Sequence, residues 1–267
     1  MATTAVKKKT GSMKVQHVVS RVLIYALLII VAALMLVPFL WMLSASFKMN
    51  KDVFPFPIEW IPSNPRPQNY IDIWTKIPLL TFVKNTAFLT IVVTILQVLT
   101  SSFAAYAFAK LNFKGKNVLF GALLATMMIP GELFTITNYS TVTNLGWMNT
   151  YTVLIVPFLV SVFYIYLLRQ NFMQIPNELY LAAKVDGTSD FKYLWKVMIP
   201  LSLPTLISIT ILKMMGAWNS YIWPRLVAND EAHRLITNGL ETVSKLTLSM
   251  SVISVLLLLE EVISVLP

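Results

Sequence analysis

The amino-acid sequence predicts an all-helical protein that crosses a membrane several times. Only 12% of its 267 residues are charged, against about 25% in a soluble domain, while 57% are hydrophobic and the mean hydropathy is +0.69. Apolar runs of about 20 residues, the length that a helix needs to cross a bilayer, recur along the chain. These runs are apolar on every side, whereas the strands of a membrane barrel alternate in polarity.

Six segments reach or approach this length, and we expect each to form one transmembrane helix. The first is too long for the apolar core of a signal peptide and no small-residue cleavage site follows it, so we expect a retained helix. Glu260 and Glu261 interrupt the sixth, for which we expect a truncated or altered end. The segments are 22–43, 86–109, 118–137, 151–168, 197–223 and 246–266.

The positions of Lys and Arg predict a cytoplasmic N-terminus, because these residues are enriched in cytoplasmic loops. We expect residues 1–17 to form a cytoplasmic tail and 18–267 a single transmembrane domain. Segment 138–150, which this orientation places outside, has no basic residue. The basic residues lie between spans rather than on one surface, so the net charge of +9 does not indicate nucleic-acid binding. Those predicted to lie inside are Lys7, Lys8, Lys9, Lys14, Arg21, Lys110, Lys114, Lys116, Arg169, Lys184, Lys192 and Lys196.

The sequence offers no catalytic group and no cofactor site. Without cysteine the chain has no disulfide and no thiolate, and its two histidines, His17 and His233, are too far apart to suggest a metal site. The glycines never give the spacing of a phosphate-binding loop. We therefore expect a protein that is not an enzyme and that binds neither metal nor ATP.

The stretch "NELYLAAKVDGTSDFKYLWKV" (177–197) carries charges and small residues between two apolar spans. Asn177 is suited to cap a first helix, and Gly187 fits the left-handed position that ends one. Thr188 or Ser189 can cap a second helix, with Asp190 in its first turn, that leads into the fifth span. We expect a short helix, a glycine turn and another helix on the cytoplasmic side.

One face of the first short helix is shallow. Leu179, Ala182, Ala183 and Asp186 share this face by helical spacing, and the two alanines allow another backbone to approach closely. The alternative is an amphipathic helix on the lipid surface, which would carry bulky anchors and basic residues on opposite faces. The alanines and the glycine turn favour docking onto a protein.

Four residues are candidates for a substrate path: Glu132, Lys213, Asn219 and Tyr221. For Glu132 the alternative is a carboxylate satisfied at a helix break, and for Lys213 a side chain that reaches the membrane interface. Asn219 and Tyr221 lie in "WNSYIWP" (218–224), whose amides, hydroxyls and aromatic rings suit a sugar. For this motif, and for Trp223 above all, the alternative is an interfacial aromatic belt. Segment 47–82 is rich in proline, so we expect it to be extended.

Several motifs together resemble the permeases of ABC importers. "IPNELYLAAKVDGTSDFKYLWKVMIPLSLP" is similar to their EAA loop, although the family has Glu where this chain has Leu181. "MMIPGELF", "LGWMNTY", "YLLRQNFMQIP" and "MGAWNSYIWP" are similar to the sugar-transport branch, specifically its smaller, maltose-permease-like subunit. The EAA-loop residues that match are Ala182, Ala183, Asp186, Gly187, Phe191, Pro200 and Pro204.

The resemblance implies a type I ABC importer permease in the bacterial plasma membrane, forming half of a sugar path. Its loop at about 169–199 would couple to a cytoplasmic ATPase dimer, which holds the ATP and Mg²⁺. The other implied partners are a second, homologous permease, an external solute-binding protein and the sugar. The coupling residues it implies are Glu178, Leu179, Ala182, Ala183, Asp186 and Gly187.

A secondary transporter or channel is the alternative function. Proteins of that kind tend to show internal repeats, broken helices and paired charges within the membrane, and none of these stands out in the sequence. The sequence does not name the sugar, and glycerol phosphate remains a second candidate substrate.

Overall fold

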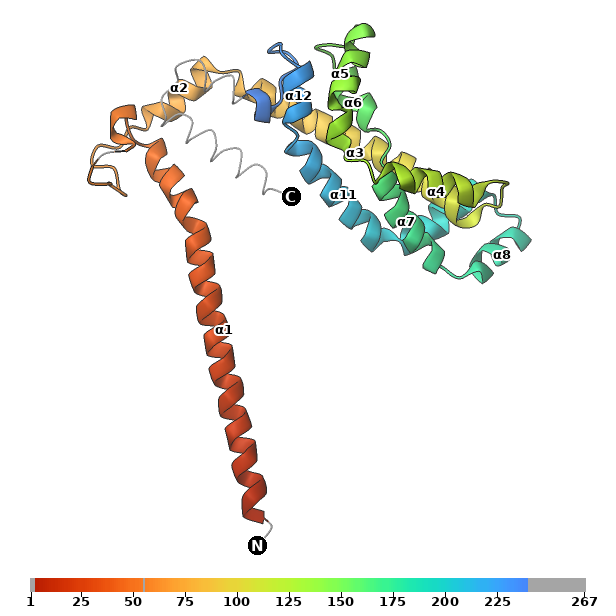
Figure 1. Ribbon diagram of the computed structural model, residues 1–267, viewed down its shortest axis with the longest axis horizontal. Coiled ribbons are helices and arrows are strands. Elements are labelled where there is room, and N and C mark those ends of the chain that lie inside the picture. The colour runs from red at the N-terminus through yellow and green to blue at the C-terminus, as the bar shows by residue number, and fades with distance from the viewer. Residues whose placement is uncertain (1–2, 55, 240–267) are drawn as a thin grey trace. The chain divides into compact units, whose positions relative to one another are not determined.

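The computed structural model describes residues 3–54 and 56–239, and every regular element among them is a helix (Figure 1). These residues form two compact units. Residues up to Ile73 belong to unit 1, and residues from Trp74 onward belong to unit 2. The sixth predicted span, 246–266, lies outside the described residues.

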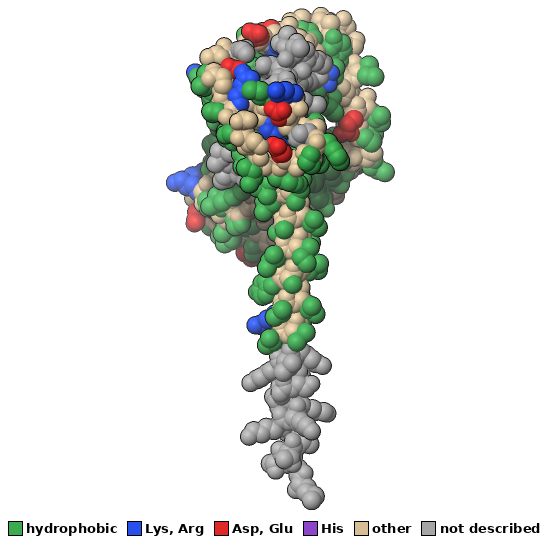
Figure 2. Space-filling view, turned by 90° about the vertical axis from the view of Figure 1, so that its left-hand side faces the viewer, with side chains coloured by type: hydrophobic (Ala, Val, Ile, Leu, Met, Phe, Trp, Pro, Cys, Tyr) green, Lys and Arg blue, Asp and Glu red, His purple; other side chains and the backbone are tan. Residues whose placement is uncertain are grey.

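Unit 1 begins with one long helix, α1 (Thr3–Ser46). The portion His17–Ser46 is long and apolar enough to cross a membrane, and it contains the predicted first span. Figure 2 shows hydrophobic side chains along α1, and those from Val18 to Leu40 are largely exposed. A helix that is apolar on all sides is typical of a membrane span.

The proline-rich segment that follows α1 is not extended throughout, so the prediction of an extended segment was wrong. It contains a short 3₁₀-helix, η1 (Asn50–Asp52), and an α-helix, α2 (Gln68–Lys76). Five of its prolines precede Gln68 and Pro78 follows Lys76, so none removes a backbone donor from α2. The side chain of Asn69 joins α2 to the end of α1 by donating to the carbonyls of Ser46 at 2.8 Å and Lys48 at 3.0 Å.

Unit 2 is organised around α3 (Leu79–Lys110), which contains the second predicted span. It packs against α7 (Val162–Gln174) and α11 (Leu203–Trp218). Two hydrophobic clusters lie along α3. One contains Tyr106 and Ala105, and we call this end of the unit the α8 end. The other contains Leu89 and Val93, at what we call the α12 end.

Three predicted spans are bent pairs of helices rather than single helices. The pairs are 116–126 with 131–144, bent by 84°, 151–158 with 162–174, bent by 42°, and 190–201 with 203–227, bent by 83°. Pro130 lies in the first break and removes a backbone donor there, whereas Pro157 and Pro204 lie in the first turns of helices within two residues of the other breaks. Counting each pair as one span, the described residues contain up to five spans. The expectation of unbroken helices was therefore wrong.

The other elements of unit 2 are short. They are α4 (Lys116–Thr126), η2 (Gly131–Phe134), α5 (Thr135–Asn144), α6 (Tyr151–Ile155), η3 (Val156–Phe158), α8 (Asn177–Val185), α9 (Asp190–Tyr193), the π-helix η4 (Leu194–Met198), α10 (Ile199–Leu201) and α12 (Ile222–Val227).

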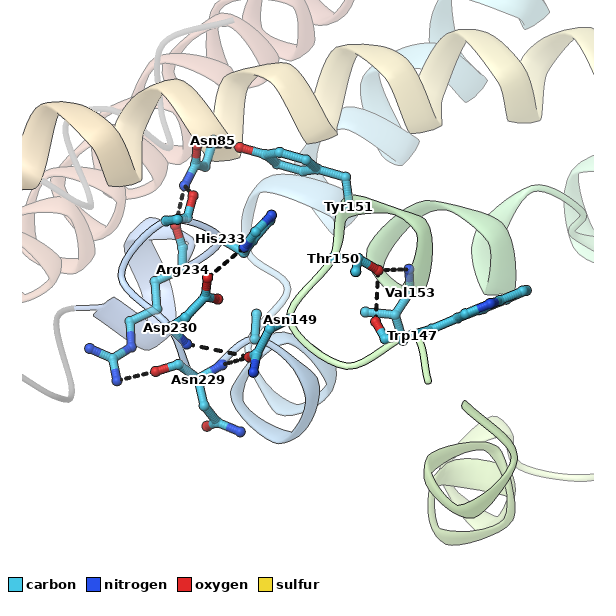
Figure 3. Close-up of polar contacts among 12 residues, drawn as sticks. Asn85, Trp147, Asn149, Thr150, Tyr151, Val153, Asn229, Asp230, His233 and Arg234 are labelled. Atoms are coloured by element: carbon cyan, nitrogen blue, oxygen red, sulfur yellow. Dashed lines mark hydrogen bonds and ion pairs between the residues drawn. The ribbon is translucent and has the colours of Figure 1, made fainter. Parts of the chain in front are cut away.

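A polar network closes the α12 end of unit 2 (Figure 3). The buried Asn85 of α3 donates to the carbonyls of Ala232 and Arg234 at 2.8 and 3.0 Å, and accepts from the Tyr151 hydroxyl at 2.7 Å. The neighbouring Thr86 hydroxyl accepts from the backbone of Ile236 at 2.8 Å. We call residues 228–236, which these contacts hold against α3, the return loop.

Replacing Asn85 with alanine should destabilise the protein by about 1–3 kcal/mol, because it removes two part-buried hydrogen bonds that hold the return loop. Thermal unfolding in detergent, with and without the substitution, measures the change. Asn144→Ala is the matched control, since Asn144 is exposed at the end of α5. Equal shifts of the unfolding midpoint in both variants would contradict this role of Asn85.

Candidate functional site

The helix α8 is held at its start by the last residue of α3. Lys110 donates to the carbonyl of Ile175 at 2.7 Å and to the side-chain oxygen of Asn177 at 2.9 Å. The prediction that Asn177 caps α8 was wrong, because Asn177 is the first helical residue and its oxygen accepts from Lys110 instead. The N-terminus of α8 is thereby attached to α3.

The predicted glycine turn at the other end of α8 is confirmed. Gly187 has φ +70°, in the left-handed region, and its N–H bonds to the Lys184 carbonyl at 3.0 Å. The next N–H, of Thr188, bonds to the Ala183 carbonyl at 2.8 Å, which completes the helix end. Of the two predicted caps, it is Ser189 that accepts from the backbone of Lys192, at 3.4 Å.

Asp190, the first residue of α9, joins three side chains from two helices. One carboxylate oxygen accepts from the hydroxyl of Tyr106, on α3, at 2.9 Å and from that of Tyr180, on α8, at 2.8 Å. The other oxygen pairs with the Lys184 ammonium of α8 at 2.9 Å. We call these four residues the Asp190 junction.

The donors of this junction keep their protons at neutral pH, so that they can bond to the Asp190 carboxylate. The hydrogen bond to Asp190 raises the pKa of Lys184 above its ordinary value. Burial, followed by the hydrogen bond to Asp190, raises the pKa of Tyr180. Both groups therefore remain protonated donors at neutral pH. A raised pKa of Lys184 means that its pairing stabilises the fold below the usual lysine range and is lost as the pH rises through the raised value.

The exposed side of α8 differs from the predicted face. Ala183 is half-buried and packs with Tyr180 against the hydrophobic cluster of the α8 end. Leu179 is 45% exposed at the flank, and Asp186 and Gly187 are exposed at the C-terminal end. The outward side, which we call the docking stripe, consists of Glu178, Leu181, Ala182 and Val185.

Three of the four candidate substrate residues line one cavity. It has a volume of about 610 Å³, within the range of small-molecule sites, and its lining includes Glu132, Asn219 and Tyr221. Lys213 lines a smaller adjoining cavity of about 70 Å³, and its ammonium lies 5.6 Å from the ring centre of Phe158. Phe158, Ser220 and Trp223 line both cavities. The four residues predicted from separate segments are thus brought together.

Trp223 does not face the membrane interface, as a residue of an aromatic belt would. Its side chain is buried, donates to the Val153 carbonyl at 3.0 Å and packs edge-on against Phe158. Among the described residues there is no group of three or more His, Cys, Asp or Glu that could hold a metal ion.

Tyr106 and Lys110 were not predicted from the sequence as residues of α3 that bond to Asp190 and to the start of α8. The opposite charges of Lys184 and Asp190 across the glycine turn were a usable signal for part of the junction. Nothing in the sequence indicated that a tyrosine from α3, distant along the chain, would reach the same carboxylate.

Comparison with known proteins identifies the family. Residues 97–260 match the family described as "Binding-protein-dependent transport system inner membrane component". The chain belongs to this family. The predicted resemblance and the predicted location in the bacterial plasma membrane are thereby confirmed. A family of transport components, rather than enzymes, also favours the importer prediction over a secondary transporter or channel.

Individual relatives of this family member are permeases. The chain is 32% identical over 215 residues to the arabinooligosaccharides transport system permease protein AraQ of Halalkalibacterium halodurans, covering 79% of this chain and 77% of the relative. It is 28% identical over 218 residues to the diacetylchitobiose uptake system permease protein NgcG of Streptomyces coelicolor, covering 81% and 72%. It is also 28% identical over 224 residues to the sn-glycerol-3-phosphate transport system permease protein UgpE of Yersinia enterocolitica, covering 82% and 80%.

A solved structure has the same fold. It is the crystal structure of a bacterial ABC transporter involved in the import of the acidic polysaccharide alginate, with a TM-score of 0.79 and 24% identity. The match covers 94% of this chain and 93% of the solved one. The permease is therefore all-helical over its described residues and has the fold of an ABC importer.

Gly187→Ala should destabilise the turn of this permease by about 1 kcal/mol, because alanine strains a left-handed backbone. A Cβ at this position would meet no atom within 4 Å, so the cost comes from the backbone alone. Gly187→Asn should cost less, because asparagine tolerates this conformation. Thermal unfolding in detergent gives the comparison, and equal losses for the two variants would contradict the explanation.

Proposed function

We propose that this chain is one of two permease subunits of an ATP-driven importer of sugars or oligosaccharides. The single observation that carries the proposal is the docking stripe on α8, within a chain that belongs to a family of binding-protein-dependent transporters. The stripe is the exposed side of a short helix that stands outside the bent spans. It offers two apolar side chains, one alanine and one carboxylate to a partner.

The docking stripe is suited to a protein groove. Leu181 and Val185 are 62% and 88% exposed, one helical turn apart, and Ala182 between them leaves room for a close approach. The single lysine of α8, Lys184, pairs with Asp190 and is not part of the docking stripe, so the stripe itself offers no basic residue to lipid headgroups. We infer that the partner is a cytoplasmic ATPase, which binds the ATP and Mg²⁺ that drive transport.

The larger cavity suits a sugar. Tyr221 and Phe158 supply aromatic rings, and Asn219, Ser220, Thr135 and Asn138 supply amides and hydroxyls that can bond to sugar hydroxyls. Two of the relatives are named for oligosaccharides and one for glycerol 3-phosphate. Glu132 in the lining disfavours an anion, so we propose a neutral sugar or oligosaccharide as the cargo.

The remaining topology follows from the charges in the sequence. We propose six spans with the N-terminus in the cytoplasm, so that the α8 end of unit 2 faces the ATPase and the α12 end faces outward. A second, homologous permease would complete the path, and an external solute-binding protein would deliver the sugar. This orientation puts the loops with most basic residues on the inside.

Ala182→Trp should reduce the amount of ATPase that co-purifies with the permease about tenfold or more, because it fills the shallow centre of the docking stripe. The measurement is the ratio of ATPase to permease after affinity purification in detergent from cells that produce the whole transporter. Ile136→Trp is the control, since Ile136 is 82% exposed on α5, in another part of unit 2. Wild-type permease that retains no ATPase would contradict the proposed function.

Asn219→Ala should lower the uptake of a radiolabelled arabino-oligosaccharide about tenfold at low sugar concentration. The reason is that the bound sugar has one hydrogen bond fewer in the variant, which weakens its binding. Uptake by proteoliposomes that contain the complete importer is compared with uptake of glycerol 3-phosphate. The co-purification of ATPase should not change, since Asn219 lies in the cavity and not on α8. Transport of glycerol 3-phosphate in place of the sugar would contradict the proposed cargo.

A further inference from the structure

The helix α3 has polar attachments at both of its ends. At the α8 end, Tyr106 donates to Asp190, and Lys110 holds the start of α8. At the α12 end, Asn85 and Thr86 hold the return loop. About 30 Å of helix separates Thr86 from Tyr106, and this stretch has no break.

A straight helix can carry a displacement only if both of its ends are firmly attached. The hydroxyl of Tyr106 is a strong attachment, because it bonds to a carboxylate and its ring is 5% exposed. The same carboxylate is tied to α8 through Tyr180 and Lys184. Lys110 attaches the N-terminal end of α8 to α3, and Asp190 adds a second link from the C-terminal half of α8 to α3.

We propose that Asp190 is a positioning residue that links α8 to α3, and that α3 transmits movement of the docked α8 to the return loop. The inference rests on the proposed function, since it takes the ATPase as the source of the movement. Asp190 contacts neither cargo nor ATP in this role. It acts by keeping two helices together while one of them is displaced.

Two tyrosines provide a matched test of the link. Tyr106 and Tyr180 donate to the same oxygen of Asp190 at nearly the same distance, but only Tyr106 belongs to α3. Tyr106→Phe removes the bond between α3 and Asp190 and leaves those between Asp190 and α8. Tyr180→Phe removes one bond from α8 and leaves the bond from α3.

The chain has no cysteine, so a single introduced cysteine can be labelled selectively. Lys84→Cys places an environment-sensitive fluorophore on an exposed residue of α3 next to the return loop. The labelled permease is purified with its ATPase and partner permease and reconstituted in lipid. The measured quantity is the change in emission on trapping with Mg-ATP and vanadate.

Trapping should change the emission of the Lys84→Cys label in the otherwise wild-type complex. Tyr106→Phe should reduce this change about fivefold, because it removes a hydrogen bond to a charged group. The expected reduction is no larger because Asp190 is partly exposed and solvent weakens the bond. Tyr180→Phe should reduce it by less than about twofold, because Lys184 still ties α8 to Asp190. Asp190→Ala should act like Tyr106→Phe, and the double variant should lose no more than Asp190→Ala alone.

The proposal is overturned if Tyr106→Phe keeps the full emission change, or if Tyr180→Phe loses as much as Tyr106→Phe. A link that served only the stability of the fold would lower the yield of the complex, so the ATPase-to-permease ratio is measured for every variant and should not change. A wild-type complex that holds its ATPase but shows no emission change overturns only the proposed transmission through α3 and leaves the proposed function unaffected. A wild-type chain that brings no ATPase overturns the proposed function, and this inference with it.

Discussion

The unbroken backbone of α3 is the constraint on which the rest of unit 2 depends. In a bilayer every backbone donor and acceptor must find a partner within the protein, and a continuous helix meets this requirement alone. At their breaks the bent spans have backbone groups without a partner in the same helix, and α3 supplies a hydrogen-bond partner for one of them. The hydroxyl of Thr100 on α3 donates at 2.6 Å to the carbonyl of Leu159, between η3 and α7. The unbroken helix thus supplies a donor at one of the three breaks.

The breaks in turn shape the cavity. Gly131 and Glu132 follow the break after α4, Pro157 and Phe158 precede the break before α7, and Asn219 separates α11 from α12. Irregular backbone at membrane depth is tolerated where it lines a polar cavity, because water or cargo can satisfy the exposed groups. The polar lining and the helix breaks are therefore two aspects of one arrangement.

The sequence was most informative where local chemistry decides the structure. The helical class, the glycine turn at Gly187 and the choice of Glu132, Asn219 and Tyr221 as candidates were accessible, because turn residues and polar side chains inside apolar runs have few explanations. That these three side chains line one cavity required the fold. The break before Glu132 was considered as an alternative, but the other two were missed although Pro157 was visible, since composition over a whole span conceals an interruption of a few residues. The half-buried position of Ala183 was missed because helical spacing defines faces but does not say which one meets the core.

The Asp190 junction shows the limit of such reasoning most clearly. Capping rules placed Asp190 in the first turn of a helix, where it does lie. Its bond to Tyr106 depends on the packing of α3 against elements that follow it much later in the chain, and no pattern within one segment contains that information. Side chains that bond across long distances in sequence are the part of the site that required the fold.

The exposed apolar surface of α1 has a consequence for how the protein is made. Its side chains from Val22 to Leu40 have no polar face that must be covered, and apart from the donor that Pro38 lacks, its backbone bonds are internal to the helix. This segment can leave the ribosome, enter the bilayer and remain there as a complete unit before the later spans exist. The bent spans have unsatisfied groups at their breaks and lack this independence. During biosynthesis α1 can therefore insert before unit 2 and anchor the chain, whereas unit 2 assembles only after its later helices have been synthesised.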